Sequence, residues 1–114
     1  MLAAEADRRC PAIITGVEAL ASSGEKNPDR IERLRVEAHG LKGAALVVDQ
    51  ERLADLARRI EDFLANCIKV GRIKPGAAAT VVAAASAFNE GAQAAAEGVG
   101  EPSSVGESLS ALDR

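Results

Sequence analysis

Residues 27–48 read NPDRIERLRVEAHGLKGAALVV, and this stretch decides the expected fold. Its apolar residues recur at alternating steps of three and four positions and are Ile31, Leu34, Ala38, Leu41, Ala45 and Val48. That spacing places them on one face of a single helix of about five turns. Asn27 is a favourable N-cap residue and Pro28 suits the first helical position, so the helix has a defined start. We therefore predict a helix that must bury one face against the rest of the chain.

Three further segments show the same helical spacing of apolar residues, and they span about residues 7–22, 50–69 and 75–96. A polar break containing Gly24 ends the first of them, and Gly71 ends the second. Asp49 is expected either to end the helix before it or to cap the helix after it. No single helix of this kind buries its apolar face alone, but four together do. The sequence thus predicts an all-α fold, an antiparallel four-helix bundle, over residues 1–97.

The remaining stretch, residues 98–114, reads GVGEPSSVGESLSALDR and is dominated by glycine, proline and serine. Such a composition favours disorder over a packed element. We expect these residues to form a flexible tail or a linker. A tail of this kind is compatible both with a stand-alone protein and with the front of a larger kinase.

Composition and charge narrow the class of protein. The 114 residues correspond to one domain, and the 47% hydrophobic content suffices for a core. Only 2% of residues are aromatic and the net charge is −3, so the chain lacks the stacking groups and positive charge of a nucleic-acid binder. We find no signal peptide and no membrane-spanning stretch, and we expect a cytoplasmic protein. Cys10 and Cys67 are too few and too far apart for a disulfide framework or a zinc site.

His39 is the only histidine in the chain. It lies one position, or about 100°, from the core residue Ala38, which places it at the edge of the buried face. Lys42 and Gly43 follow at three and four residues and share its side of the helix. A nucleophilic imidazole beside a cation and a cleared surface fits a histidine that carries a phosphoryl group. The position alone is more typical of an ordinary surface or boundary histidine, and the combination with Lys42 and Gly43 makes the two interpretations about equal.

The segment over residues 38–45, AHGLKGAA, resembles the AHxLKGxA motif of histidine-containing phosphotransfer (HPt) domains. Residues 53–61, LADLARRIE, resemble the next helix in the HPt domains of chemotaxis-type histidine kinases. The likeness covers about residues 27–69 and implies a helical bundle. The resemblance also implies a role for each of four site residues. His39 would be the phosphoacceptor, and Lys42 would stabilise the charge of the phosphoryl group. Glu61 would orient the imidazole, and Gly43 would leave space for a partner.

The chain departs from the pattern of that family at several positions. Asp49 and Gln50 stand where the family often has Gly and Phe, so the turn between the two helices should differ. Gly40 replaces a larger residue beside the histidine, which should loosen the helix there. Arg58 stands where chemotaxis-type members often carry a second histidine. These departures bear on the subfamily more than on the function.

The resemblance implies a phosphorelay intermediate without ATP binding or autokinase activity. His39 would carry the phosphoryl group between a kinase or a phosphorylated receiver and the aspartate of a response regulator. The expected partners are therefore a receiver domain and a histidine kinase catalytic domain, with Arg35, Leu46 and Arg58 as candidate docking residues. No cofactor or metal of its own is expected, because the Mg²⁺ needed for transfer belongs to the receiver. We expect a monomer.

Two other functions remain open from the sequence. The first is a helical adaptor that binds a receiver domain or another signalling partner without transferring phosphate. The second is a dimerising helix pair of a sensor kinase, although such a pair usually carries an acidic residue directly after its histidine, and here Gly40 follows. The cognate kinase, the regulator and the direction of phosphoryl flow are not encoded in any motif of this chain.

Overall fold

Five helices make up the secondary structure of residues 1–113, the part of the chain that the computed structural model describes. They are α1 (Leu2–Ser23), α2 (Pro28–Val47), α3 (Glu51–Val70), α4 (Pro75–Glu97) and α5 (Ser103–Leu112). Residues 1–113 contain no β-strand, so the prediction of an all-α fold is confirmed. None of these helices has a stretch that is both long and apolar enough to cross a bilayer.

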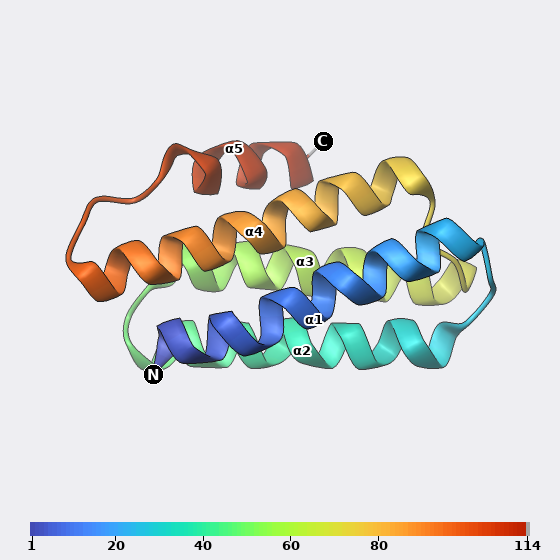
Figure 1. Cartoon of the computed structure of the whole chain (residues 1–114), viewed down its shortest axis with the longest axis horizontal. Coiled ribbons are helices and arrows are strands. Elements are labelled where there is room, and N and C mark those ends of the chain that lie inside the picture. Colours follow the sequence, from blue (N-terminus) through green and yellow to red (C-terminus); the bar gives the residue numbers. More distant parts are fainter. Residues whose placement is uncertain (114) are drawn as a thin grey trace.

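The first four helices lie along the long axis of the molecule, and each runs opposite to the one before it (Figure 1). Contacts join α1 to α2, α2 to α3, α3 to α4 and α4 back to α1, so each of these four helices has two neighbours among the other three. The fifth helix rests on α3 and α4. Because α2 and α3 lie side by side, side chains from these two helices meet at one surface.

The predicted helix ends agree with the local backbone chemistry. The Asn27 side chain accepts a hydrogen bond from the Arg30 amide at 3.1 Å, which caps α2 as expected. Gly24 and Gly71 end α1 and α3 in the left-handed conformation, at φ 65° and 86°. Asp49 also has a left-handed backbone, with φ 58°, and lies in the turn between α2 and α3. It therefore does not cap α3, whose N-cap is Gln50.

The core is formed by the apolar faces that the spacing predicts. On α2 the buried residues are Ile31, Leu34, Ala38, Leu41 and Ala45. The sixth predicted position, Val48, lies just beyond the helix and is 43% exposed, so the buried stripe is one residue shorter than predicted. Helix α1 begins at Leu2, earlier than the predicted start near residue 7, and Leu2, Ala6 and Cys10 extend its buried face toward the N-terminus.

The expectation of a flexible tail is wrong for residues 103–112, which form α5 with buried side chains at Val105, Ser108 and Leu109. Gly91 of α4 makes room for this helix, since a Cβ atom there would come within 3.1 Å of Val105 and 2.6 Å of Leu53. The physical reason is a short apolar stripe, Val105, Leu109 and Leu112, at helical spacing within a glycine- and serine-rich stretch. Arg114, the last residue of the expected tail, lies outside the described residues.

Replacing Val105 by alanine tests whether α5 is part of the folded core. Val105 is fully buried, so the change should lower the free energy of unfolding by about 1–3 kcal/mol. Urea denaturation followed by circular dichroism measures this difference. The control is Ser110→Ala, an exposed position on the same helix. Equal stability of the two variants would mean that α5 does not pack on the other helices in solution.

Candidate functional site

His39 lies on the outer side of α2, with its side chain 63% exposed. The next residue toward the N-terminus, Ala38, is fully buried in the core, so the histidine stands at the edge of the buried face as predicted. Its Nδ1 atom is 2.9 Å from Oε2 of Glu61 on α3. Because α2 and α3 pack side by side, the imidazole of α2 lies against a carboxylate of the neighbouring helix α3.

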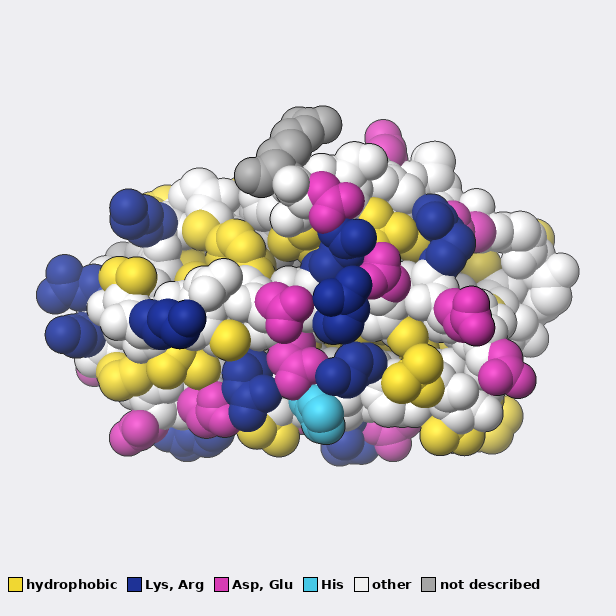
Figure 2. All heavy atoms as spheres, turned by 180° about the vertical axis from the view of Figure 1, so that it is seen from behind, with side chains coloured by type: hydrophobic (Ala, Val, Ile, Leu, Met, Phe, Trp, Pro, Cys, Tyr) yellow, Lys and Arg dark blue, Asp and Glu magenta, His cyan; other side chains and the backbone are white. Residues whose placement is uncertain are grey.

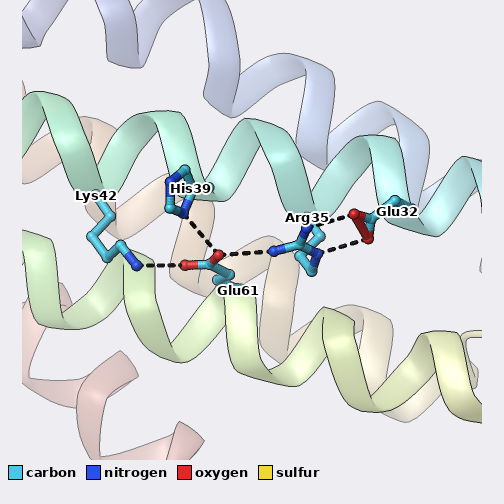
Figure 3. Close-up of polar contacts among 5 residues, drawn as sticks. All are labelled: Glu32, Arg35, His39, Lys42 and Glu61. Carbon is cyan, nitrogen blue, oxygen red and sulfur yellow. Dashed lines mark hydrogen bonds and ion pairs between the residues drawn. The ribbon is translucent and has the colours of Figure 1, made fainter.

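Glu61 is the centre of the site (Figure 3). Its side chain is only 11% exposed, and Lys42 and Arg35 of α2 approach it from opposite sides. The Lys42 Nζ atom is 2.9 Å from Oε1, and the Arg35 Nη1 atom is 3.0 Å from Oε2. One nearly buried carboxylate thus contacts a lysine, an arginine and the histidine.

The electrostatic surroundings keep Glu61 ionised. Burial is the largest single influence and raises its pKa, but hydrogen bonds and charge interactions with Lys42 and His39 outweigh that influence, so the pKa is lowered overall. An ionised carboxylate only accepts hydrogen bonds, so the Nδ1 atom of His39 carries the proton. The Nε2 atom of the neutral ring is left with its lone pair, which makes it the nucleophilic nitrogen.

Glu32 is a member of the site that sequence reasoning missed. Its carboxylate accepts hydrogen bonds from Arg35 through Nε at 2.7 Å and through Nη2 at 2.5 Å. The signal was the spacing of three residues between Glu32 and Arg35, which is common on helix surfaces and carries little specificity. Arg35, expected as a docking residue, is therefore held between two carboxylates and is 29% exposed.

The two glycines beside His39 differ in their surroundings. A Cβ atom at Gly43 would meet nothing within 4 Å, so the surface there is open. A Cβ atom at Gly40 would come within 2.5 Å of the Arg9 guanidinium from α1. Arg9 is held there by Glu37 at 2.6 Å and Glu5 at 2.8 Å. Gly40 therefore has a packing role, because it admits the Arg9 side chain. The looser helix expected there from the sequence stays a prediction.

The other two candidate docking residues form no ion pair with the cluster around Glu61 within residues 1–113. Leu46 is 54% exposed near the end of α2, beside the exposed Val47, and Val36 is exposed near the middle of the same helix. Arg58 is exposed and pairs with Asp55 and Asp62 of its own helix, and no ion pair joins it to Glu61 within residues 1–113. Figure 2 shows the histidine on an open face, with basic and acidic side chains gathered around it and apolar side chains nearby.

The same surface, as far as the structure describes it, holds no cluster of metal ligands. Residues 1–113 contain no group of three or more histidine, cysteine, aspartate or glutamate side chains placed to ligate one. The arrangement instead combines a nucleophilic ring nitrogen, a fixed tautomer and nearby cations. These features suit a site that accepts and releases an anionic group.

Comparison with known proteins identifies one matching protein family. A family model described as "Hpt domain" matches residues 2–98, which includes the whole cluster around Glu61 and helices α1 to α4. No curated protein and no solved structure gives a significant match. Helix α5 lies beyond the matched region.

Proposed function

The chain belongs to the Hpt domain family, whose members carry out histidine phosphotransfer in phosphorelays, and on this premise we propose that His39 is the phosphoacceptor. The observation that carries the proposal is the 2.9 Å contact between Nδ1 of an exposed His39 and the ionised Glu61. It leaves Nε2 free to react and points to a defined chemical step. The resemblance to HPt domains inferred from the motif is confirmed by the family match.

In the forward step, the Nε2 lone pair attacks the phosphorus of a phospho-aspartate on a receiver domain. A nitrogen–phosphorus bond forms as the oxygen–phosphorus bond of the acyl phosphate breaks, and its electron pair leaves with the aspartate carboxylate. The proton on Nδ1 stays in place, so the ring gains positive charge that Glu61 offsets. In the return step, a receiver aspartate attacks the phosphorus, and the bonding pair returns to Nε2.

Lys42 supplies the charge for the phosphoryl group in this proposal. It lies one helical turn from His39, and its ammonium already reaches Oε1 of Glu61 at 2.9 Å. A dianionic phosphoryl group on the ring competes with Glu61 for this ammonium. Lys42 therefore stabilises the phosphorylated form most, because a new and larger negative charge has appeared within its reach.

The partner would dock over α2 and α3, around His39. Gly43 leaves room for close approach, and the exposed Leu46 offers an apolar contact. Arg58 adds a cation near the rim for acidic residues of the partner. Members of this family act with kinases and receiver domains, and we propose a receiver domain and a kinase catalytic domain as partners here. The receiver would contribute the Mg²⁺, and this chain, as a cytoplasmic monomer built on an antiparallel bundle of α1 to α4, would need no cofactor of its own.

A phosphotransfer assay tests the proposed function. The protein is mixed with a panel of receiver domains phosphorylated by a small-molecule donor, and separately with kinases and ATP. We expect label on this chain that is lost in acid and retained in alkali, as for phosphohistidine. Binding of a receiver at micromolar affinity with no label across the panel would instead establish the adaptor that does not transfer phosphate.

Replacing Gly43 by alanine tests whether a partner approaches this position, because the change should affect stability and phosphotransfer in opposite directions. The open surface accepts a methyl group, so we expect the free energy of unfolding to rise by about 1 kcal/mol because alanine favours the helix. Transfer from a phosphorylated receiver should nevertheless slow, and Gly43→Gln should slow it further through its bulk. Urea denaturation and single-turnover transfer rates give the two quantities. A stabilised Gly43→Gln protein with unchanged transfer would show that no partner approaches this position.

A further inference from the structure

We propose that Arg35, itself fixed by Glu32, is a positioning residue that holds the Glu61 carboxylate in place and, through it, the imidazole of His39. The inference deepens the proposed function and rests on it for the role of His39. It assigns a role in the reaction to a residue pair that the sequence alone places in docking or leaves unnoticed.

The geometry of the guanidinium carries this inference. Arg35 donates from Nε and Nη2 to the two oxygens of Glu32, which fixes the plane of the group. Its remaining terminal nitrogen, Nη1, donates to Oε2 of Glu61 at 3.0 Å. This is the oxygen that accepts the Nδ1 proton of His39 (Figure 3). A continuous chain of contacts therefore runs from Glu32 through Arg35 and Glu61 to the ring.

The two cationic side chains beside Glu61 differ in how freely they can move. Within residues 1–113 the ammonium of Lys42 forms an ion pair with Glu61 alone, and its flexible stem allows it to turn toward a phosphoryl group on His39. Arg35 is fastened at its other end to Glu32 and stays. When Lys42 moves to the phosphoryl oxygens, Arg35 remains as the cation that keeps the carboxylate charged and oriented. The ring is thus held in both the free and the phosphorylated states.

The same contacts argue against a docking role for Arg35. Its side chain is 29% exposed, and each of its three guanidinium nitrogens already donates a hydrogen bond to Glu32 or Glu61. A partner carboxylate would have to displace one of these interactions before it could bind. Positioning and docking therefore predict different results when Arg35 is replaced.

The test measures the protonation of the ring nitrogens by ¹⁵N chemical shifts of labelled His39, at alkaline pH above the usual titration range of histidine. The variants are Arg35→Ala, Arg35→Lys and Glu32→Ala. The control is Arg33→Ala, an exposed arginine on the same helix with no ion pair within residues 1–113. Circular dichroism checks that each protein folds. Glu32→Ala keeps the test valid if Arg35→Ala does not fold, because Glu32 is half-exposed.

We expect the fraction of rings protonated on Nδ1 to fall in Arg35→Ala and, to a smaller extent, in Glu32→Ala. Arg35→Lys should restore part of the native fraction, because an ammonium retains the charge but lacks the fork that spans both carboxylates. Phosphorylation of His39 by a receiver should slow by about three- to fivefold in Arg35→Ala, with receiver affinity unchanged.

Unchanged ¹⁵N shifts in both Arg35→Ala and Glu32→Ala would overturn the inference, and weaker receiver binding with native shifts would assign Arg35 to docking instead. The proposed function fails separately. If the native protein takes no phosphate from any donor while the shifts move as expected, the ring is held as inferred but serves another purpose.

Discussion

The His39→Gln protein is expected to take up no phosphoryl group from any receiver or kinase that labels the native protein. The glutamine amide nitrogen has its lone pair delocalised into the carbonyl, so it is not a nucleophile toward phosphorus. His39 is the only histidine in the chain, so no second imidazole is available to replace it. The rate should therefore fall to the uncatalysed background. Single-turnover transfer from a labelled receiver, followed by gel separation, measures the effect.

Loss of folding does not explain this expected result. His39 is 63% exposed and is not part of the hydrophobic core, so its replacement should change the free energy of unfolding by no more than about 0.5 kcal/mol. The glutamine amide also keeps a donor that is able to reach Glu61. Receiver binding should survive, because the contact surface around the position is unchanged. Label that persists on His39→Gln would place the phosphate on another residue and contradict the proposed function.

The parts of the fold that the sequence predicted were those determined by local spacing. The steps of three and four in α2 identified Ile31 to Ala45 as its buried face, and Gly71 marked the end of α3. The prediction that Val48 is buried was wrong, because periodicity does not show where a helix stops and α2 ends at Val47. Its exposure follows from the turn, which departs from helical geometry at Asp49.

The fifth helix was missed because composition outweighed spacing in the interpretation. Residues 103–112 include four serines and a glycine, which favour disorder, yet three apolar side chains at helical spacing suffice when a packing site already exists. That site depends on Gly91 of the preceding helix, α4, and on Leu53 of α3, which is distant in the sequence. A tertiary partner of this kind leaves no local signal.

In the candidate site, too, only the features determined by local spacing could be predicted from the sequence. His39 and Lys42 share one helix face, so their proximity followed from the period of the helix. Glu61 belongs to another helix, and only the resemblance to a family with this spacing placed it beside the ring. The roles of Glu32 and of Arg9 could not be predicted, because each depends on how a neighbouring side chain is oriented. Common surface ion pairs resemble them in sequence.

Glu61→Ala is expected to give the second largest loss of phosphotransfer, about 10- to 100-fold, with His39 still present. The estimate corresponds to the loss of one hydrogen bond involving a charged group, at about 1.5–3 kcal/mol. Without the carboxylate, the ring rotates freely and samples the tautomer with its proton on Nε2, which does not react. The single-turnover rate from a labelled receiver measures the loss. A rate equal to that of the native protein would mean that the contact at 2.9 Å does not orient the ring.

The pH dependence of stability tests the same contact without any partner. The pKa of Glu61 lies below its ordinary value of 4.5 in the folded protein, because Lys42 and His39 outweigh the effect of burial. The folded state thus binds the proton less tightly than the unfolded state, so the ionised carboxylate stabilises the fold above pH 4.5. That contribution is lost as the pH falls from there through the lowered pKa.

Glu61→Gln lacks this titration, whereas the other carboxylates are common to both proteins and largely cancel in the difference. The gap in unfolding free energy between the native protein and Glu61→Gln should therefore be greatest near neutral pH and should shrink below pH 4.5. Urea denaturation across this range measures the gap. A gap that is independent of pH would show that Glu61 is not paired in solution. It would also remove the physical basis for a fixed tautomer at His39, because a carboxylate that is not paired with the ring accepts no hydrogen bond from Nδ1.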